Sequence, residues 1–142
     1  MSGSTTSIPT QTVDEYWLWA RSQTKAFPSG PRTGKWMLFY DKSVIDERWT
    51  AVKTLVEHDL LGGLAKCSTA RENSNATSSK TGVIIVYTSD YLDQEEVYRV
   101  AVTLHEKMDY KKTIYYKTDD QTYSGLYAKN GSKVNHLYRY PL

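Results

Sequence analysis

The clearest β-strand of the chain is Val83-Ile84-Ile85-Val86-Tyr87-Thr88, in which β-branched side chains dominate. Its apolar run, residues 83–87, is as long as any in the sequence and far shorter than the ~18–20 residues needed to span a bilayer. We therefore expect no membrane-spanning segment and no membrane partner. Further strands are expected at residues 35–40, 64–68, 113–117, 122–128 and 137–140, the last as an edge strand.

Two amphipathic helices are expected, one on each side of this strand in the sequence. The first begins near Ser43, and its apolar residues fall on one helical stripe. The second runs from about Gln94 to Met108, with Asp93 as its N-cap. The residues expected to be buried are Ile45, Trp49, Val52 and Val56 in the first helix and Val97, Val100, Ala101, Leu104 and Met108 in the second.

Residues 12–20 allow two interpretations. Thr12-Val13-Asp14-Glu15 has the form of a capping box, and Val13, Tyr16, Trp17 and Ala20 follow at helical spacing. The aromatic run Tyr16-Trp17-Leu18-Trp19 is equally typical of a strand. We favour the helix, because the cap and the acidic first turn agree with each other.

Length and composition indicate one domain. The chain has 142 residues, of which 39% are hydrophobic, and its single Cys excludes an internal disulfide. Residues 1–11 are rich in Ser and Thr and are expected to be a disordered tail, so that residues 12–142 form the domain. Because strands outnumber helices and several links are of hairpin length, we predict an α+β fold with the helices on one face of an antiparallel sheet. No secretory signal is visible, so the expected compartment is the cytoplasm, with the nucleus as the alternative.

No pattern in the sequence predicts catalysis. There is no glycine-rich phosphate loop, no nucleophile elbow and no zinc-protease helix. The three His residues lie on different predicted elements, and Cys67 is expected to be a buried apolar residue. Helix capping explains much of the acidic cluster of Asp90, Asp93, Glu95 and Glu96. We therefore expect a protein that is not an enzyme and needs no metal or cofactor.

Aromatic and basic residues are the more informative feature. The chain has four Trp and twelve Tyr, although Trp36 and Trp49 are expected in the core. Arg71 and Lys80 flank a polar connection at residues 70–82, and Arg32 lies in a Pro- and Gly-rich loop that begins at Phe27. Aromatic side chains on a sheet, together with cations on loops, can stack bases and hold phosphates. The net charge of +2 is too small to indicate nucleic acid by itself.

Several segments resemble the basophilic-leukaemia-expressed protein family. They are Gly34-Lys35-Trp36-Met37, Ala65-Lys66-Cys67-Ser68, residues 83–90, Tyr116-Lys117-Thr118-Asp119 and residues 122–130. The resemblance implies a fold like that of the cap-binding translation initiation factor 4E, a curved antiparallel sheet with two to three helices on its convex face.

The cap-binding family itself is similar at a greater distance. Its Gly-Arg-Trp strand resembles Gly34-Lys35-Trp36, and its acidic helix ending in Trp resembles residues 46–49. Its strand ending in Trp-Thr-Thr resembles residues 86–89, with Tyr87 in place of the Trp. Its dorsal helix docks partner peptides through a Trp, which implies such a role for Trp17. The loop at residues 27–32 has no Trp and no carboxylate, so the resemblance does not extend to the residues that bind the cap.

Two hypotheses of function follow. In the first, the chain is a non-catalytic module that binds RNA or a cap-like nucleotide in the mouth of the sheet. Tyr87 would line this site, Phe27 or Arg32 would cover the base, and Arg71 with Lys80 would hold phosphates. In the second, the chain is a protein-interaction adaptor that docks the helix of a partner at the Trp17 face and has no nucleotide ligand.

Overall fold

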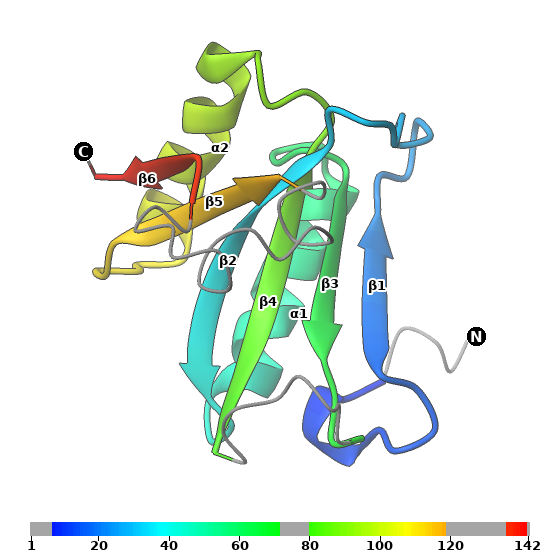
Figure 1. Cartoon of the computed structure of the whole chain (residues 1–142). Coiled ribbons are helices and arrows are strands. Elements are labelled where there is room, and N and C mark those ends of the chain that lie inside the picture. Colours follow the sequence, from blue (N-terminus) through cyan, green and yellow to red (C-terminus); the bar gives the residue numbers. More distant parts are fainter. Residues whose placement is uncertain (1–6, 72–79, 119–135, 142) are drawn as a thin grey trace, which may run out of the picture.

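Six antiparallel strands form one curved sheet in the order β1-β3-β4-β2-β5-β6 (Figure 1). The computed structural model describes residues 7–71, 80–118 and 136–141. The strands are β1 (Trp17–Arg21), β2 (Gly34–Asp41), β3 (Leu64–Ser68), β4 (Thr81–Thr88), β5 (Ile114–Thr118) and β6 (Tyr138–Tyr140). The sheet is strongly twisted, so that β5 and β6 run at a steep angle to β1 in Figure 1.

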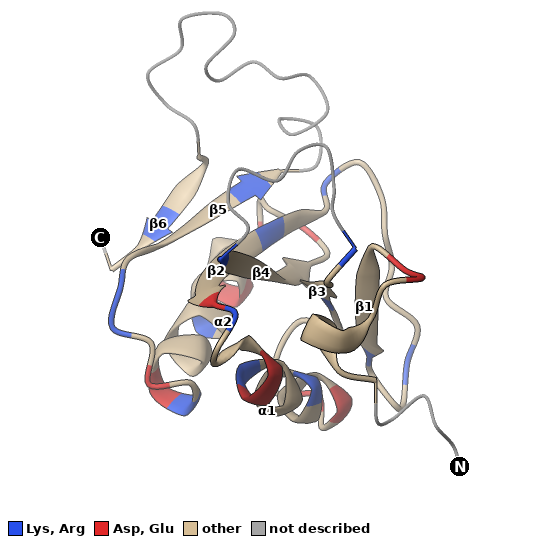
Figure 2. Ribbon diagram, turned by 90° about the horizontal axis from the view of Figure 1, so that it is seen from below, with Lys and Arg blue, Asp and Glu red and all other residues tan. Residues whose placement is uncertain are grey.

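Both α-helices cover the same face of the sheet, as Figure 2 shows from the edge. They are α1 (Ile45–Glu57) and α2 (Gln94–Lys107). The core lies between these helices and the sheet and contains all nine helix residues predicted to be buried. Asp93 caps α2 as predicted, since its carboxylate accepts a hydrogen bond from the backbone N–H of Glu96 at 3.3 Å. The predicted α+β architecture is therefore confirmed.

The predicted helix at residues 12–20 is wrong, and the strand alternative is right. Trp17–Arg21 form β1, which pairs with β3 from Trp17 opposite Ser68 to Arg21 opposite Leu64. A helix would have buried Val13 and Tyr16, but these side chains are 69% and 42% exposed. Pairing with a distant strand therefore prevails over the local capping signal, which encodes only one turn.

The remaining strand predictions are confirmed where the structure describes them, and β6 is an edge strand. The strand expected at residues 122–128 and the middle of the polar connection, residues 72–79, lie outside the described residues. So do residues 1–6, and the division into a tail and a domain therefore stays a prediction.

Residues 9–11 form a short 3-10 helix, η2 (Pro9–Gln11), beside the start of α1. Pro9 is buried, and the backbone N–H and the hydroxyl of Thr10 donate to the Asp46 carboxylate at 3.0 and 2.6 Å. Neither helix combines the length and the apolar composition that crossing a bilayer requires, within the part of the chain that the structure describes.

Candidate functional site

The face of the sheet opposite α1 and α2, here called the open face, carries a mixture of aromatic and basic side chains. Successive residues of a strand point to opposite faces, so each strand sends one set of side chains to the core and the other set to the open face. On the open face lie Trp17, Trp19 and Arg21 of β1, Leu64 and Lys66 of β3, Val83, Ile85 and Tyr87 of β4, Lys35, Met37 and Phe39 of β2, Tyr115 and Lys117 of β5, and Arg139 of β6.

Three aromatic rings surround one ammonium group at the β1 side of the open face. The Nζ of Lys66 lies 4.0 Å from the ring centroid of Trp17, 5.3 Å from that of Trp19 and 5.9 Å from that of Tyr87. The rings of Trp19 and Tyr87 are almost parallel, with 6.4 Å between centroids and 13° between planes. Each ring attracts a cation through its quadrupole, and such contacts contribute about 0.5–2 kcal/mol. The cluster is therefore held together by a cation of the chain itself.

These rings differ in their access to solvent. Tyr87 is buried together with Leu64 and Ile85 in a small apolar cluster, and Phe27 packs edge-on against its ring at 6.2 Å. Trp19 is 44% exposed on the edge strand β1. Trp19 is thus the most exposed ring of the cluster, with Tyr87 stacked against it and the Arg21 guanidinium 5.5 Å from its ring centroid.

Two lysines lie directly opposite each other on the open face, at the end of the sheet that contains Tyr87. Lys35 of β2 pairs with Lys117 of β5 on one side and with Tyr87 of β4 on the other. Lys35 is only 8% exposed, and the pKa of Lys117 is lowered, first by burial and second by the charge of Lys35. Like charges directly opposite in a sheet are destabilising. The arrangement concentrates positive potential beside the aromatic cluster.

The charge is distributed unevenly between the two layers of the fold. The six strands contain five basic residues and one acidic residue, Asp41, at the end of β2. Acidic residues instead gather on the helices, as Figure 2 shows in red. They are Asp46, Glu47 and Glu57 on α1 and Glu95, Glu96 and Glu106 on α2. The helices also carry Arg48, Lys53, Arg99 and Lys107, so their charges nearly balance, and an anionic ligand would be attracted more strongly to the sheet.

The sequence-predicted site residues fall into two groups at opposite ends of the sheet. Tyr87 and Phe27 are in contact, and Arg32 lies near the same end of β4, where it forms an ion pair with Asp90 at 3.1 Å. Lys80 precedes β4, so seven residues, or roughly 23 Å of extended strand, separate it from Tyr87.

Arg71 lies at the Lys80 end of the sheet, just beyond the end of β3. Its guanidinium lies 4.3 Å from the ring centroid of Tyr16 and donates to the carbonyl of Asp14 at 3.2 Å. Trp17, expected on a helix, lies on β1 and joins the cluster around Lys66. The structure thus brings Tyr87, Phe27 and Trp17 together and leaves Arg71 and Lys80 at the far end.

In the aromatic cluster and the lysine pair, four residues were missed in the sequence: Trp19, Lys35, Lys66 and Lys117. The helix predicted at residues 12–20 concealed Trp19, which as a strand residue alternates with the buried Ala20. Lys66 carried a usable signal, since it is a single charge between the apolar residues Ala65 and Cys67 of a predicted strand and must therefore face away from the core. Lys35 and Lys117 stand at the first and last positions of their predicted strands, where this signal is weaker.

Other candidate sites have structural explanations. Burial raises the pKa of the Cys67 thiol, which makes a poor nucleophile. Asp93 caps α2, and Asp90 pairs with Arg32 and accepts from the N–H of Leu92. No group of three His, Cys, Asp or Glu side chains suited to a metal occurs among the described residues.

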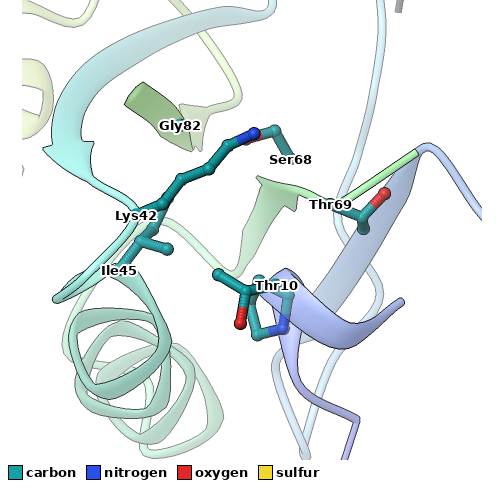
Figure 3. A pocket seen from close by; sticks show the side chains of 7 residues that line it. Thr10, Lys42, Ile45, Ser68, Thr69 and Gly82 are labelled. Atoms are coloured by element: carbon teal, nitrogen blue, oxygen red, sulfur yellow. The ribbon is translucent and has the colours of Figure 1, made fainter. Parts of the chain in front are cut away.

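A small cavity lies between η2, the start of α1 and the ends of β3 and β4 (Figure 3). Its volume of about 10 Å³ corresponds to a single water-sized sphere, so it is too small for a ligand. It is lined by Pro9, Thr10, Lys42, Ile45, Ser68, Thr69 and Gly82.

A comparison with known families matches most of the chain. The model of the family described as basophilic leukemia-expressed protein Bles03 matches residues 9–125. The resemblance inferred from the sequence is thereby confirmed. The matched segment includes both the aromatic cluster around Lys66 and the lysine pair of β2 and β5.

Solved structures with a similar fold are those of eIF4E proteins. One is eIF4E-3 of Ascaris suum in complex with the m7G cap, with a TM-score of 0.57 and 17% identity over 78% of this chain and 58% of the other. A second is schistosome eIF4E with m7GpppA and 4E-BP, with a TM-score of 0.58 and 17% identity over 79% of this chain and 61% of the other.

A third similar structure is that of C. elegans eIF4E-3 with the 4E-binding protein Mextli and a cap analog. Its TM-score is 0.54, with 14% identity over 66% of this chain and 54% of the other. The chain therefore spans less than two thirds of the length of these proteins. At such low identity the similarity establishes the fold, which is the expected 4E-like one.

Proposed function

The chain belongs to the family of basophilic leukemia-expressed protein Bles03, and from this premise we propose that it is a non-catalytic module that binds RNA or a nucleotide on the open face. The observation that carries the proposal is the presence of stacking rings and cations on the side of the sheet that neither described helix, α1 nor α2, covers. Proteins that bind single-stranded nucleic acid combine a positively charged surface with aromatic side chains on which bases stack. The similar eIF4E structures hold a cap or a cap analog, which agrees with a nucleotide ligand.

In this proposal a base stacks on Trp19, the exposed ring of the cluster. Tyr87 and Phe27 support the platform, as the packing of their rings suggests. Three lysines attract the phosphates. Lys66 lies opposite Trp19 on the neighbouring strand, Lys35 lies opposite Tyr87, and Lys117 lies opposite Lys35.

The cations outside the strands, Arg32, Arg71 and Lys80, are assigned to the periphery of the site. Arg32 lies near the Tyr87 end and can contact a ligand if it exchanges Asp90 for a phosphate. Arg71 and Lys80 lie roughly 23 Å from Tyr87 along β4, which is too far for a mononucleotide that stacks on Trp19. They are assigned to phosphates of a longer strand.

The cluster around Lys66 also suggests a charge preference. A cationic base, such as an N7-methylated guanine, is attracted to aromatic faces for the same reason as an ammonium group. Lys66 already supplies a cation to the faces of Trp17, Trp19 and Tyr87. We therefore expect the chain to bind methylated and unmethylated nucleotides with similar affinity.

The test is a titration of the ¹⁵N-labelled chain with GTP and with a short RNA, followed by NMR at several salt concentrations. The expected result is a shift of the Trp19 indole and of β2 and β5 amides, with an affinity that falls as salt rises. Trp19→Ala should weaken binding by about tenfold. Leu60→Ala is the matched control, because Leu60 is equally exposed at 44% but lies beyond α1. Shifts that are absent, or that do not depend on salt, would refute the proposal.

A second candidate function is the docking of a partner helix at Trp17. It is favoured by the position of Trp17 on the edge strand β1, where the ring is only half-buried. Two of the similar structures contain a protein partner, 4E-BP or Mextli. A pull-down that compares the wild type with Trp17→Ala tests this candidate, and unchanged partners would exclude it. Because Trp17 and Trp19 are on the same face, RNA should compete with such a partner.

A further inference from the structure

We infer that the ligand of the open face is a single-stranded RNA of several nucleotides, because the face carries a second exposed aromatic platform at its β2–β5 side. This inference rests on the proposed function and extends it from one base to several. The second platform consists of Tyr115, which is 40% exposed, and Phe39, which is 49% exposed. The His136 ring packs beside Tyr115, with 4.7 Å between centroids.

The register of the strands places the two platforms far apart in one cross-strand row. Trp19 pairs with Lys66, Lys66 with Ile85, Ile85 with Met37, and Met37 with Tyr115. Neighbouring strands lie about 4.8 Å apart, so four steps separate Trp19 from Tyr115 by roughly 19 Å along the sheet. One nucleotide cannot contact both rings, whereas a strand of several nucleotides can.

Each platform has a cation as its direct neighbour in the row. Lys66 lies opposite Trp19 at one end, and Arg139 of β6 lies opposite Tyr115 at the other. Lys35 and Lys117 pair with each other in the adjacent row. A single strand of nucleic acid presents bases and phosphates in alternation, and the face repeats the matching pair of ring and cation at two places.

Charge complementarity distinguishes this occupant from a protein. Exposed aromatic side chains alone would equally suit an apolar partner surface. Here five cations and the single carboxylate of Asp41 lie on the strands, which favours a polyanion with flat apolar groups. Single-stranded RNA has both properties, whereas an acidic peptide has only the charge.

The experiment compares uridine monophosphate, hexauridylate and hexaglutamate as ligands of the full chain, with NMR shifts and fluorescence as readouts. Hexauridylate should bind at least tenfold more tightly than the monophosphate. Tyr115→Ala should weaken hexauridylate binding about tenfold and monophosphate binding much less. Tyr115→Phe, which keeps the stacking ring, should restore the affinity, and Trp19→Ala should weaken both ligands.

The outcomes separate this inference from the proposed function. Equal affinities for the two uridylates, with no effect of Tyr115→Ala, would overturn the inference and leave a single-nucleotide site. Equal binding of hexaglutamate and hexauridylate would overturn it as well, because charge alone would then explain recognition. If neither uridylate bound, the proposed function would fail and the inference with it.

Discussion

The two faces of the sheet are built from the same strands but differ in how far their side chains are buried. On the helix-covered face most large side chains are enclosed, and polar groups deep in the core are paired: the Trp36 indole donates to the Val97 carbonyl at 2.9 Å, and the hydroxyls of Thr88 and Tyr116 bond at 2.6 Å. On the open face the rings of Trp19 and Tyr115 remain more than one third exposed. The covered face thus contributes stability, and the open face is available for a ligand.

Alternation along a strand makes this division possible, because a residue can change on one face without a direct effect on the other. Gly34, Trp36 and Leu38 of β2 are buried on the covered side, whereas Lys35 and Phe39 carry charge and exposed apolar surface on the open side. Neighbouring residues should therefore respond very differently to substitution, either in stability or in binding.

The largest difference is expected between two tryptophans. Trp36 is fully buried and packs edge-on against Tyr116, with 5.2 Å between centroids. Trp36→Ala should lower the free energy of unfolding by about 3–5 kcal/mol, because it removes a large buried side chain and leaves a cavity. Trp19→Ala should lower it by about 1 kcal/mol or less and reduce binding instead. Denaturation in urea measures both, and equal losses would contradict the division between the faces.

The next difference is expected between two adjacent tyrosines of β5. Tyr116→Phe removes the partner of the Thr88 hydroxyl, which is 1% exposed, and should cost about 1–3 kcal/mol of stability. Tyr115→Phe is the matched control on the open face and should leave the stability almost unchanged. Urea denaturation of the two variants side by side provides the measurement. A loss for Tyr115→Phe as large as that for Tyr116→Phe would show that the open face is not free of structural constraints.

The covered face was predicted well from the sequence because its signals are local. The stripe from Ile45 to Val56 and the cap at Asp93 each follow from the spacing of a few residues. The exception was β1, where Thr12-Val13-Asp14-Glu15 offers a helix start that is local too. Pairing with β3 brings together residues about 50 positions apart, and no local pattern of β1 contains that information.

The open face was predicted only in part for the same reason. Tyr87 and Phe27 were identified because they lie in recognisable segments: Tyr87 in the apolar strand β4 and Phe27 in a Pro-rich loop. The contact of Lys66 with three rings depends on β1, β3 and β4 at once, and only the assembled sheet reveals it. Arg71 and Lys80 were assigned to the site from their loop, but the length of β4 separates them from Tyr87.

A smaller effect should appear when the cluster loses its own cation. Lys66→Met removes the ammonium group from the face of Trp17 and leaves Arg21, at 5.5 Å from the ring centroid, as the remaining cation of the chain over Trp19. The affinity for N7-methylated GTP relative to GTP should then rise about two- to tenfold. The ratio is the quantity to measure, by fluorescence titration, because both nucleotides lose the same phosphate contact. Lys112→Met is the control, because Lys112 is an exposed lysine outside the strands. An unchanged ratio for Lys66→Met would show that the base does not bind at the aromatic cluster.

The smallest effect concerns the lysine pair and depends on pH. Lys117→Met removes the repulsion from Lys35, and at neutral pH it should raise the free energy of unfolding by about 0.2–1 kcal/mol. Because burial and Lys35 lower the pKa of Lys117, the folded chain binds fewer protons than the unfolded one between that pKa and the ordinary value of about 10.4. The stability of the wild type therefore rises with pH in this interval, and the advantage of the variant shrinks.

This pH dependence must be measured as a difference between the two proteins, by urea denaturation from pH 7 to 10.5. Burial raises the pKa of Tyr40 to about 12, so its titration lowers stability as pH rises above the ordinary value of about 10. That contribution opposes the effect of Lys117, but it is present in both proteins and cancels in the difference. An advantage of Lys117→Met that stays constant up to pH 10.5 would mean that packing rather than charge causes it. In that case repulsion between Lys35 and Lys117 would not be what destabilises the sheet, and the charge of this pair would give no support to a binding face at β5.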